Sequence, residues 1–190
     1  MRVVLASSSP RRKELMEMFN IPFEIIVKNT NEKLNNSKDC YNQCMDIAEE
    51  KAKTVFNEIT EDDIIVIGSD TVVIYDNEIY GKPKNLSDAY NMIKLFSGNI
   101  HEVVSSLCVL IRKNGKVYEE KTFDKCNVFV SFMTDEEIRD WVENHDVLTR
   151  AGAYAIQDGF AKYIDKIEGD YFSIVGLPVH KLYEILKKYL

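Results

Sequence analysis

The sequence predicts an α/β fold, built on a mixed twisted sheet with flanking helices. One sign is the β-branched run Ile64–Gly68, which is typical of a fully buried central strand. Another is the pair of long segments Ile100–Arg112 and Lys116–Phe132, which Asn114-Gly115 joins as a strong hairpin signal. Segments with a helical apolar stripe alternate with these strands. That mixture favours a mixed sheet covered by helices.

Two short strands and two helices are expected ahead of the central strand. The strands are Val3–Ala6 and Phe23–Lys28. Ser9 offers an N-cap and Pro10 a first helical position, so a helix begins there. The buried face of this helix is expected to carry Leu15, Met16 and Phe19. The Asn-rich segment 29–39 reads as an exposed loop. The next helix is indicated by an apolar stripe at Tyr41, Met45, Ala48, Ala52, Val55 and Ile59.

Further helices and one more sheet segment are expected after the central strand. Ser87 can cap a short helix that runs to Phe96. Thr134 and Glu137 fit a capping box, which begins a helix that ends at Asn144. A strand at residues 72–75, followed by a turn, is expected directly after the central strand. A sheet-like stretch at 151–167 and a terminal helix that opens at Pro178 are expected at the end of the chain.

Composition limits the classes of protein that fit this chain. At 190 residues and 45% apolar composition, we expect a single domain, 1–190, with a sizeable core. No apolar stretch reaches the length of a membrane span and the N-terminal apolar run is too short for a signal peptide, so we expect a cytoplasmic protein without a membrane partner. The net charge of −7 disfavours nucleic acid as a partner. The four cysteines form no CxxC pair and are interpreted as structural.

The segment Ser7-Ser8-Ser9-Pro10-Arg11-Arg12 is the first candidate site. A strand that enters a helix through hydroxyl residues leaves backbone N–H groups pointing outward, and the helix dipole favours an anion there. Arginines in the first helical turn are unfavourable unless an anion is bound, which favours phosphate binding. The alternative is a capped surface helix with solvated arginines. No GxxxxGK[ST] run exists, so the segment is not a P-loop.

Other candidates are single polar residues. Asp70 follows the buried strand, where ligands bind in α/β folds. Its carboxylate suits holding a hydrated Mg²⁺ or accepting a proton from an attacking water. It also suits a simple strand-end turn. Lys82, on a rigid Gly/Pro turn, fits either a phosphate contact or an exposed lysine. Gln157 fits a nucleobase edge or a surface position, and His101 fits a base or a structural histidine.

Several motifs occur together along almost the whole chain. They are LASSSPRRKELM at 5–16, NEK at 31–33, AEEKA at 48–52, IGSDTVV at 67–73, GKP at 81–83, FSGNIHEV at 96–103, AGAYAIQ at 151–157 and GDYFSIVGLP at 169–178. In this order they resemble the Maf, or septum-formation inhibitor, family of nucleoside triphosphate pyrophosphatases. The resemblance implies a fold similar to inosine triphosphate pyrophosphatases, with a two-lobed cleft. It also implies cleavage between the α and β phosphates, a divalent cation (Mg²⁺ or Mn²⁺) and a homodimer.

The resemblance also implies roles for individual residues. Asp70 looks like the family's proton acceptor or metal carboxylate, Glu32 like its second acidic residue and metal ligand, and Lys51 like its catalytic helix lysine. The expected phosphate contacts are Ser7, Arg12 and Lys82. Metal-assisted attack of water on the α-phosphorus is the mechanism that this set implies.

Substrate choice is expected to depend on Arg11, Thr71 and Gln157, a set that resembles the branch acting on dTTP and UTP. The sister branch that prefers methylated GTP has tryptophan in place of Arg11. The chain departs from the family motif at Asp158, where glycine is usual, and at Arg150, where lysine is usual. Both departures bear on fine specificity.

Two other functions remain open from the sequence. One is a nucleotide-binding regulator of cell division with little turnover, and the other is a phosphatase that releases inorganic phosphate. A carboxylate that faces phosphates repels the ligand unless a metal intervenes, which favours an enzyme over a simple binding site.

Overall fold

A computed structural model of the chain describes residues 1–30 and 37–190. Its helices and strands are β1 Arg2–Leu5, α1 Pro10–Glu17, β2 Glu24–Ile25, α2 Cys40–Phe56, β3 Ile64–Tyr75, β4 Glu78–Tyr80, α3 Leu86–Phe96, β5 Ile100–Lys113, β6 Lys116–Val130, α4 Asp135–Asn144, β7 Ile164–Glu168, α5 Tyr171–Val175 and α6 Val179–Leu186, with 3₁₀ turns η1 Ala151–Ala153 and η2 Gly159–Tyr163.

The strands form one mixed sheet. Within the described residues it has seven strands in the order β2-β1-β3-β5-β6-β7, and β4 pairs with β3. β1 is parallel to β2 and β3, whereas the β3–β4 and β6–β7 pairs are antiparallel. The predicted α/β class, a mixed sheet with flanking helices, is therefore confirmed. The predicted two-lobed cleft stays a prediction.

The chain forms two compact units. Unit 1 comprises Met1–Asp70, Ser105–Asp124 and Gly176–Leu190, and unit 2 comprises Thr71–Val104 and Lys125–Val175. Each unit has its own apolar core. The core of unit 1 includes Val4, Ala48, Ala52, Ile64, Val66 and Leu110. The core of unit 2 includes Phe96, Val128, Trp141, Tyr154, Phe160 and Tyr163. No helix in the described part of the chain is long and apolar enough to cross a bilayer.

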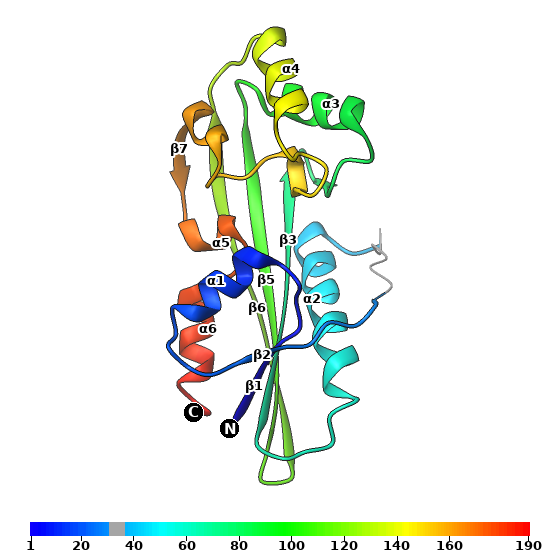
Figure 1. Cartoon of the computed structure of the whole chain (residues 1–190), viewed down its shortest axis with the longest axis vertical. Helices are drawn as coiled ribbons and strands as arrows, with labels where there is room; N and C mark the ends of the chain where they lie inside the picture. Colours follow the sequence, from blue (N-terminus) through cyan, green and yellow to red (C-terminus); the bar gives the residue numbers. More distant parts are fainter. Residues whose placement is uncertain (31–36) are drawn as a thin grey trace. The chain divides into compact units, whose positions relative to one another are not determined.

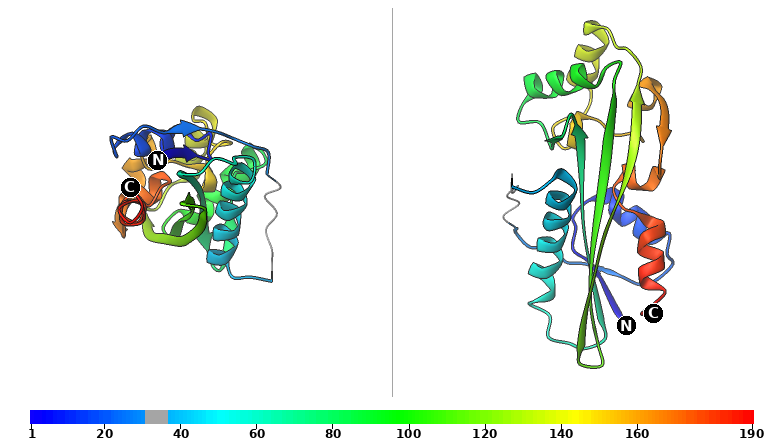
Figure 2. Two further views of the ribbon diagram at one scale, coloured as in Figure 1. Left: turned by 90° about the horizontal axis from the view of Figure 1, so that it is seen from below. Right: turned by 180° about the vertical axis from the view of Figure 1, so that it is seen from behind.

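In unit 1 the helices cover both faces of the sheet. α2 lies along one face, and α1 and α6 lie on the other (Figures 1 and 2). The contact between α2 and β3 is unusually close at Gly68, because a Cβ there would stand 2.2 Å from the carbonyl oxygen of Ala48. Only a residue without a side chain allows this approach. Gly68 therefore determines how near the middle of α2 comes to the following residues of β3.

Four predicted element boundaries were wrong. The strand predicted at Phe23–Lys28 is reduced to β2, because β1 ends at Leu5 and offers pairs only to Glu24 and Ile25. α3 is capped by Asn85, not Ser87, since the Asn85 side chain accepts from the amide of Asp88. Two helices are also shorter than predicted, because Phe19 lies beyond the last residue of α1 and Ile59 beyond the last residue of α2.

The sheet-like stretch predicted at 151–167 was the largest error. It contains two 3₁₀ turns, and only β7 at its end is a strand. Gly152 and Ala153 have φ of 67° and 65°, a left-handed conformation that ends an extended chain. Tyr154, Phe160 and Tyr163 are nevertheless buried, so the apolar pattern reflects turns folded onto the core of unit 2 and not a pleated strand.

Several other predictions were confirmed. Thr134 and Glu137 form the predicted capping box of α4, with both reciprocal hydrogen bonds. Asn114 and Gly115 have φ of 52° and 71° and connect β5 to β6, as their sequence predicts for a tight hairpin. The terminal helix α6 follows Pro178.

Candidate active site

The segment between β1 and α1 folds into a cationic turn. Ser9 occupies the N-cap of α1, but its side chain makes no capping hydrogen bond, and the first helical turn contains no acidic residue. The Ser7 hydroxyl instead accepts from the Ser9 amide at 3.3 Å. The positive end of the helix dipole is thus not neutralised by a local carboxylate. This arrangement suits an anion supplied from outside the helix.

Arg12 is held in place inside this turn. Its Nη1 donates to the Ser7 hydroxyl at 3.1 Å, and its Nε donates to the carbonyl oxygen of Gly176 at 2.9 Å. Only 9% of the residue is exposed. A guanidinium fixed by two hydrogen bonds loses little further entropy when it binds an anion, and its planar fork matches phosphate oxygens. Arg12 is therefore preorganised for phosphate.

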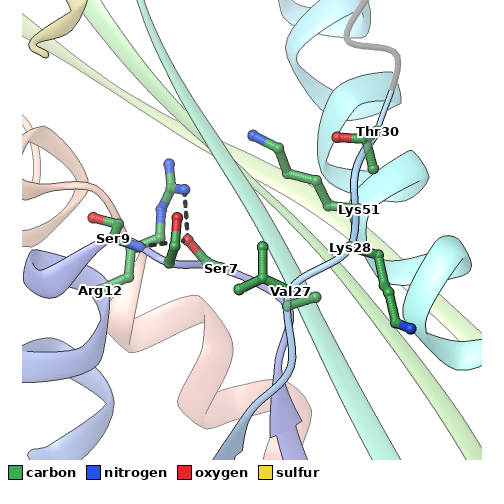
Figure 3. A pocket seen from close by; sticks show the side chains of 9 residues that line it. Ser7, Ser9, Arg12, Val27, Lys28, Thr30 and Lys51 are labelled. Atoms are coloured by element: carbon green, nitrogen blue, oxygen red, sulfur yellow. Dashed lines mark hydrogen bonds between the residues drawn. The ribbon is translucent and has the colours of Figure 1, made fainter.

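A small polar pocket lies against this turn. It has a volume of about 150 Å³ and is lined by Ala6, Ser7, Ser8, Ser9, Arg12, Val27, Lys28, Thr30 and Lys51. Figure 3 shows the serines and Arg12 on one side and Lys51 with Thr30 on the other, while the Lys28 amine points away. Lys28 instead pairs with Glu58 at 2.6 Å. Because pockets for whole ligands usually measure about 300–1,000 Å³, this one suits a group such as a phosphate.

Lys51 connects the pocket to Asp70. Lys51 lies on α2 and Asp70 on β3, and the close approach at Gly68 brings these elements together. The Lys51 Nζ is 2.7 Å from the Asp70 Oδ1, and the two side chains are only 16% and 13% exposed. An ammonium and a carboxylate at this distance form a charge-assisted hydrogen bond. Lys51 therefore lies between the phosphate-sized pocket and the carboxylate.

The predicted position of Asp70 at a strand end was wrong, because Asp70 lies inside the 12-residue strand β3. β1 pairs with β3 up to the Leu5–Ile67 pair, and β4 begins pairing at Val73. Asp70 falls after the first set of pairs and before the second. The strand continues there, but its parallel neighbour has ended and the chain turns toward α1, so the carboxylate reaches the same region that a strand end would.

Buried polar groups support the backbone at Asp70. The Ser106 hydroxyl donates to the carbonyl oxygen of Cys44 at 2.8 Å, and the Cys44 thiol lies 3.7 Å from the carbonyl oxygen of Asp70. Burial, and then the charge of Asp70, raise the pKa of the Cys44 thiol to about 12. Cys44 is consequently a neutral packing group at pH 7 and not a nucleophile.

The structure brings part of the predicted site together. Ser7, Arg12 and Lys51 line one pocket, and Asp70 contacts Lys51. Arg11 is half-buried on α1 and is not among the pocket's lining residues. Glu32 lies outside the described residues.

The other predicted substrate contacts belong to unit 2. Thr71 follows Asp70 in β3, and Lys82 and Gln157 are exposed. His101, by contrast, is 2% exposed, and its Nε2 lies 2.6 Å from the Tyr154 hydroxyl. Burial lowers the pKa of His101 to about 3, so the imidazole is neutral at pH 7. The structural interpretation of His101 is the one that this geometry supports.

Sequence reasoning gave no role to Gly176 or Ser69. The Gly176 carbonyl accepts from Arg12 and also from the Ser69 hydroxyl at 3.2 Å. Gly176 has φ of 134°, which a residue with a side chain rarely adopts. The one signal in the sequence is the Gly-Leu-Pro run at 176–178, a turn marker before α6. It indicates a turn but not that its carbonyl orients an arginine far away in the sequence.

Comparison with known proteins agrees with this geometry. The profile of the family described as Maf-like protein matches residues 2–189. The chain belongs to the Maf-like protein family. A dTTP/UTP pyrophosphatase from Alkaliphilus oremlandii is 41% identical over 188 residues, which cover 99% of this chain and 96% of the relative. One from Lachnoclostridium phytofermentans is 42% identical over 189 residues, covering 99% and 95%. The dTTP/UTP pyrophosphatase of Clostridium novyi is 40% identical over 188 residues, covering 97% of this chain and 96% of the relative.

A solved structure also aligns with this Maf-like chain. It is a nucleoside-triphosphatase, or dITP/XTP pyrophosphatase, from Mycobacterium abscessus. The alignment covers 100% of this chain and 95% of the other at 11% identity, with a TM-score of 0.45. A score this low adds nothing to the conclusions about fold or function.

Proposed function

We propose that this Maf-like protein hydrolyses dTTP and UTP to the nucleoside monophosphate and pyrophosphate. The observation that carries the proposal is the Lys51–Asp70 pair, in which an ammonium that lines the phosphate-sized pocket is 2.7 Å from a carboxylate. A phosphate group bound in this pocket and the carboxylate of Asp70 would both lie within reach of the Lys51 side chain. Relatives named dTTP/UTP pyrophosphatase align with this chain over almost the full length of both proteins, which supports the same substrate class.

The pocket supplies the groups that a triphosphate requires. Arg12 offers the donors of its guanidinium, oriented by Ser7 and Gly176. Lys51 adds a second cation, and the start of α1 adds the positive end of a helix dipole. Fixed positive groups of this kind stabilise charge that develops on phosphate oxygens during hydrolysis. In the proposed complex Lys82 is a further phosphate contact.

Asp70 is the proposed proton acceptor. Its Oδ1 is engaged by Lys51. Phosphate oxygens compete for the same ammonium, so binding of the triphosphate would weaken the pair and leave the carboxylate oxygen available to a water molecule. Asp70 then orients the attacking water and accepts its proton as the oxygen–α-phosphorus bond forms and the bond to the pyrophosphate breaks.

A divalent cation that arrives with its substrate is part of the proposal. The described residues contain no group of three or more His, Cys, Asp or Glu side chains placed to hold a metal ion. Mg²⁺ is commonly bound by one or two carboxylates together with substrate phosphates, and Asp70 offers one such carboxylate. Glu32 is the proposed second ligand. When bound, Mg²⁺ or Mn²⁺ would neutralise phosphate charge and polarise the phosphoryl group.

The nucleoside contacts, the assembly and the location are also part of the proposal. Gln157 is assigned to the pyrimidine edge, with Arg11 and Thr71 as further specificity residues. An amide offers one acceptor and two donors, which suits the O4/N3 edge of thymine or uracil. Units 1 and 2 are proposed to act as one domain, as a homodimer in the cytoplasm. Within the described residues none of the four cysteines forms a disulfide, which suits a reducing compartment.

The test is a product analysis. The protein is incubated with a panel of nucleoside triphosphates and Mg²⁺ or Mn²⁺, and the products are separated and quantified. We expect equal amounts of monophosphate and pyrophosphate, with dTTP and UTP turned over fastest. Release of inorganic phosphate and nucleoside diphosphate would instead identify a phosphatase. Tight binding without products would identify a nucleotide-binding regulator.

A further inference from the structure

The turn that presents Gln157 has a firmly fixed base. Tyr154 and Phe160 flank the turn, are both buried in the core of unit 2, and stack with ring centroids 4.4 Å apart. The Tyr154 hydroxyl lies 2.6 Å from the His101 Nε2, a short hydrogen bond in an apolar surrounding. Both ends of segment 154–160 are therefore held by packing that does not depend on exposed charges.

The backbone that enters the turn is also fixed. The Trp141 Nε1 donates to the carbonyl oxygen of Ala153 at 3.1 Å. Ala153 has φ of 65°, a conformation that costs free energy for a residue with a side chain. Surrounding contacts maintain it, because the indole holds its carbonyl and Ala153 is fully buried. The chain therefore leaves the core at residue 154 in one defined direction.

The tip of the turn is held differently. Ile156, Gln157 and Asp158 form a turn in which the Asp158 amide donates to the Ala155 carbonyl at 3.2 Å. Gln157 and Asp158 are exposed, whereas Ile156 is half-buried against the core of unit 2. The Asp158 Oδ2 lies 3.3 Å from the Arg150 Nη2, which ties the tip back to the residue before η1. The Arg150 side chain is 21% exposed and that of Asp158 44%. This contact joins residues 150 and 158, the two ends of a stretch that includes Gln157.

Arg150 is suited to act as an anchor. Its Nε is buried and has no hydrogen-bond partner within the described structure. A guanidinium with a buried, unpaired donor depends more strongly on the partners that its other donors find. The Asp158 carboxylate is such a partner, at the outer end of the same guanidinium. Loss of this carboxylate would leave Arg150 poorly satisfied and would remove the side-chain contact that holds Asp158, the residue next to Gln157.

We propose that the Arg150–Asp158 ion pair positions Gln157 and thereby sets the preference for pyrimidine over purine nucleoside triphosphates. The proposal rests on the proposed function, in which Gln157 contacts the base. Arg150 and Asp158 are positioning residues that act through Gln157. Their effect appears in the ratio of kcat/KM for dTTP to kcat/KM for dATP. The two substrates carry the same triphosphate, so changes in phosphate binding cancel in this ratio.

A different role for Arg150 makes a different prediction. If Arg150 contacted a phosphate, its removal would lower kcat/KM for dTTP and dATP by the same factor. As a positioning residue, its removal changes the ratio. Because a partly exposed ion pair contributes modestly, the expected loss of the ratio is roughly two- to fivefold. A discrimination based on one oriented hydrogen-bonding side chain is sensitive to small displacements.

The experiment compares Asp158→Asn, Arg150→Gln and the double variant with the wild-type protein. Each single variant should lower the ratio of kcat/KM for dTTP to kcat/KM for dATP by the same factor. The double variant should lower it no further than either single variant, because the pair acts as one unit. Asp158→Glu keeps a carboxylate and should recover most of the ratio. Glu168→Gln is the matched control, since it neutralises one member of another exposed pair in unit 2, with Lys166 on β7.

Salt concentration gives a second, mutation-free measurement. Exposed ion pairs are screened by salt, so the wild-type ratio should fall as salt rises, whereas the ratio of Asp158→Asn should stay constant. Thermal denaturation shows whether each variant is folded.

The proposal would be overturned, while the proposed function stands, if the ratio of the wild-type protein did not change with salt concentration. The same holds if Asp158→Asn kept the wild-type ratio of kcat/KM for dTTP to kcat/KM for dATP. An equal loss for both substrates in Arg150→Gln would also overturn it, in favour of a phosphate contact. A wild-type protein that releases no pyrophosphate from either substrate would remove the proposed function and this inference together.

Discussion

Asp70→Asn removes the carboxylate charge at nearly constant volume, so its effect on stability follows from loss of the Lys51–Asp70 pair. Both side chains are mostly buried, at 16% and 13% exposure, with 2.7 Å between nitrogen and oxygen. Breaking a fully buried pair costs about 3–5 kcal/mol, because one charge stays uncompensated, whereas an exposed pair contributes about 0–1 kcal/mol. For this partly buried pair we expect a loss of about 2 kcal/mol in the free energy of unfolding.

The same substitution should lower catalysis much more than stability. A loss of about 2 kcal/mol corresponds to a fall in Tm of roughly 4–8 °C for a chain of this size. Removal of one electrostatic or proton-accepting group typically costs roughly 10²–10³ in rate. The assay measures pyrophosphate release from dTTP with Mg²⁺ at a temperature well below the Tm of the variant, so that unfolding does not contribute to the loss.

A second variant separates the two effects. In Lys51→Met/Asp70→Asn both charges are absent, so no buried charge is unpaired and most of the lost stability should return. Activity should not return, because the acceptor and the phosphate cation are both missing. Full pyrophosphate release by Asp70→Asn would refute the role assigned to the carboxylate. Equal stability of Asp70→Asn and the wild-type protein would refute the importance assigned to the pair.

Three further predictions follow from single contacts. Gly68→Ala should lose about 1–3 kcal/mol or more of stability and also activity, because a Cβ 2.2 Å from the Ala48 carbonyl oxygen would push α2, with Lys51, away from β3. Arg12→Lys should lose roughly tenfold or more in kcat/KM, because lysine cannot reproduce the two oriented hydrogen bonds of the guanidinium. His101 should make stability fall on acidification: burial lowers its folded pKa from 6.5 to about 3, so the unfolded chain takes up the proton first. This contribution is complete above pH 6.5 and is lost toward pH 3, with a slope approaching about 1.4 kcal/mol per pH unit.

Each of these predictions has a matched control. Gly81→Ala adds the same methyl group where nothing lies within 4 Å, and should leave the Tm almost unchanged. Lys13→Gln removes a neighbouring cation that is 54% exposed and pairs with Glu17 at 3.7 Å, and should change kcat/KM less than twofold. In His101→Gln the extra acid sensitivity between pH 6.5 and 5 should disappear, measured by urea unfolding at each pH. Similar behaviour of test and control variants would contradict the corresponding argument.

Local signals in the sequence predicted much of the fold. The capping box at Thr134 and Glu137 and the turn at Asn114-Gly115 depend on a few adjacent residues, and both form as expected. The stretch 151–167 failed because its apolar residues are buried by packing of turns on the core of unit 2, which alternation along the sequence does not reveal. The length of β2 failed because the end of β1, a distant segment, limits its pairing.

The candidate site shows the same division. Residue types and motif order indicated phosphate binding at Ser7 and Arg12 and an acidic group at Asp70. They did not indicate that Arg12 is oriented by the Gly176 carbonyl, because the two residues lie 164 positions apart in the chain. Nor did they indicate the contact of Lys51 with Asp70, which depends on a glycine in β3. The role of Glu32 stays a prediction.

The sequence alone determined the class of fold, the family and the chemical character of the residues offered to a triphosphate, because these depend on composition, periodicity and the order of motifs. The tertiary structure decided which of those residues meet. It placed Lys51 between a phosphate-sized pocket and Asp70, and it joined Asp158 to Arg150 beside Gln157. The reason is physical: hydrogen bonds and ion pairs require partners within about 3–4 Å, and only the packing of distant segments provides that proximity.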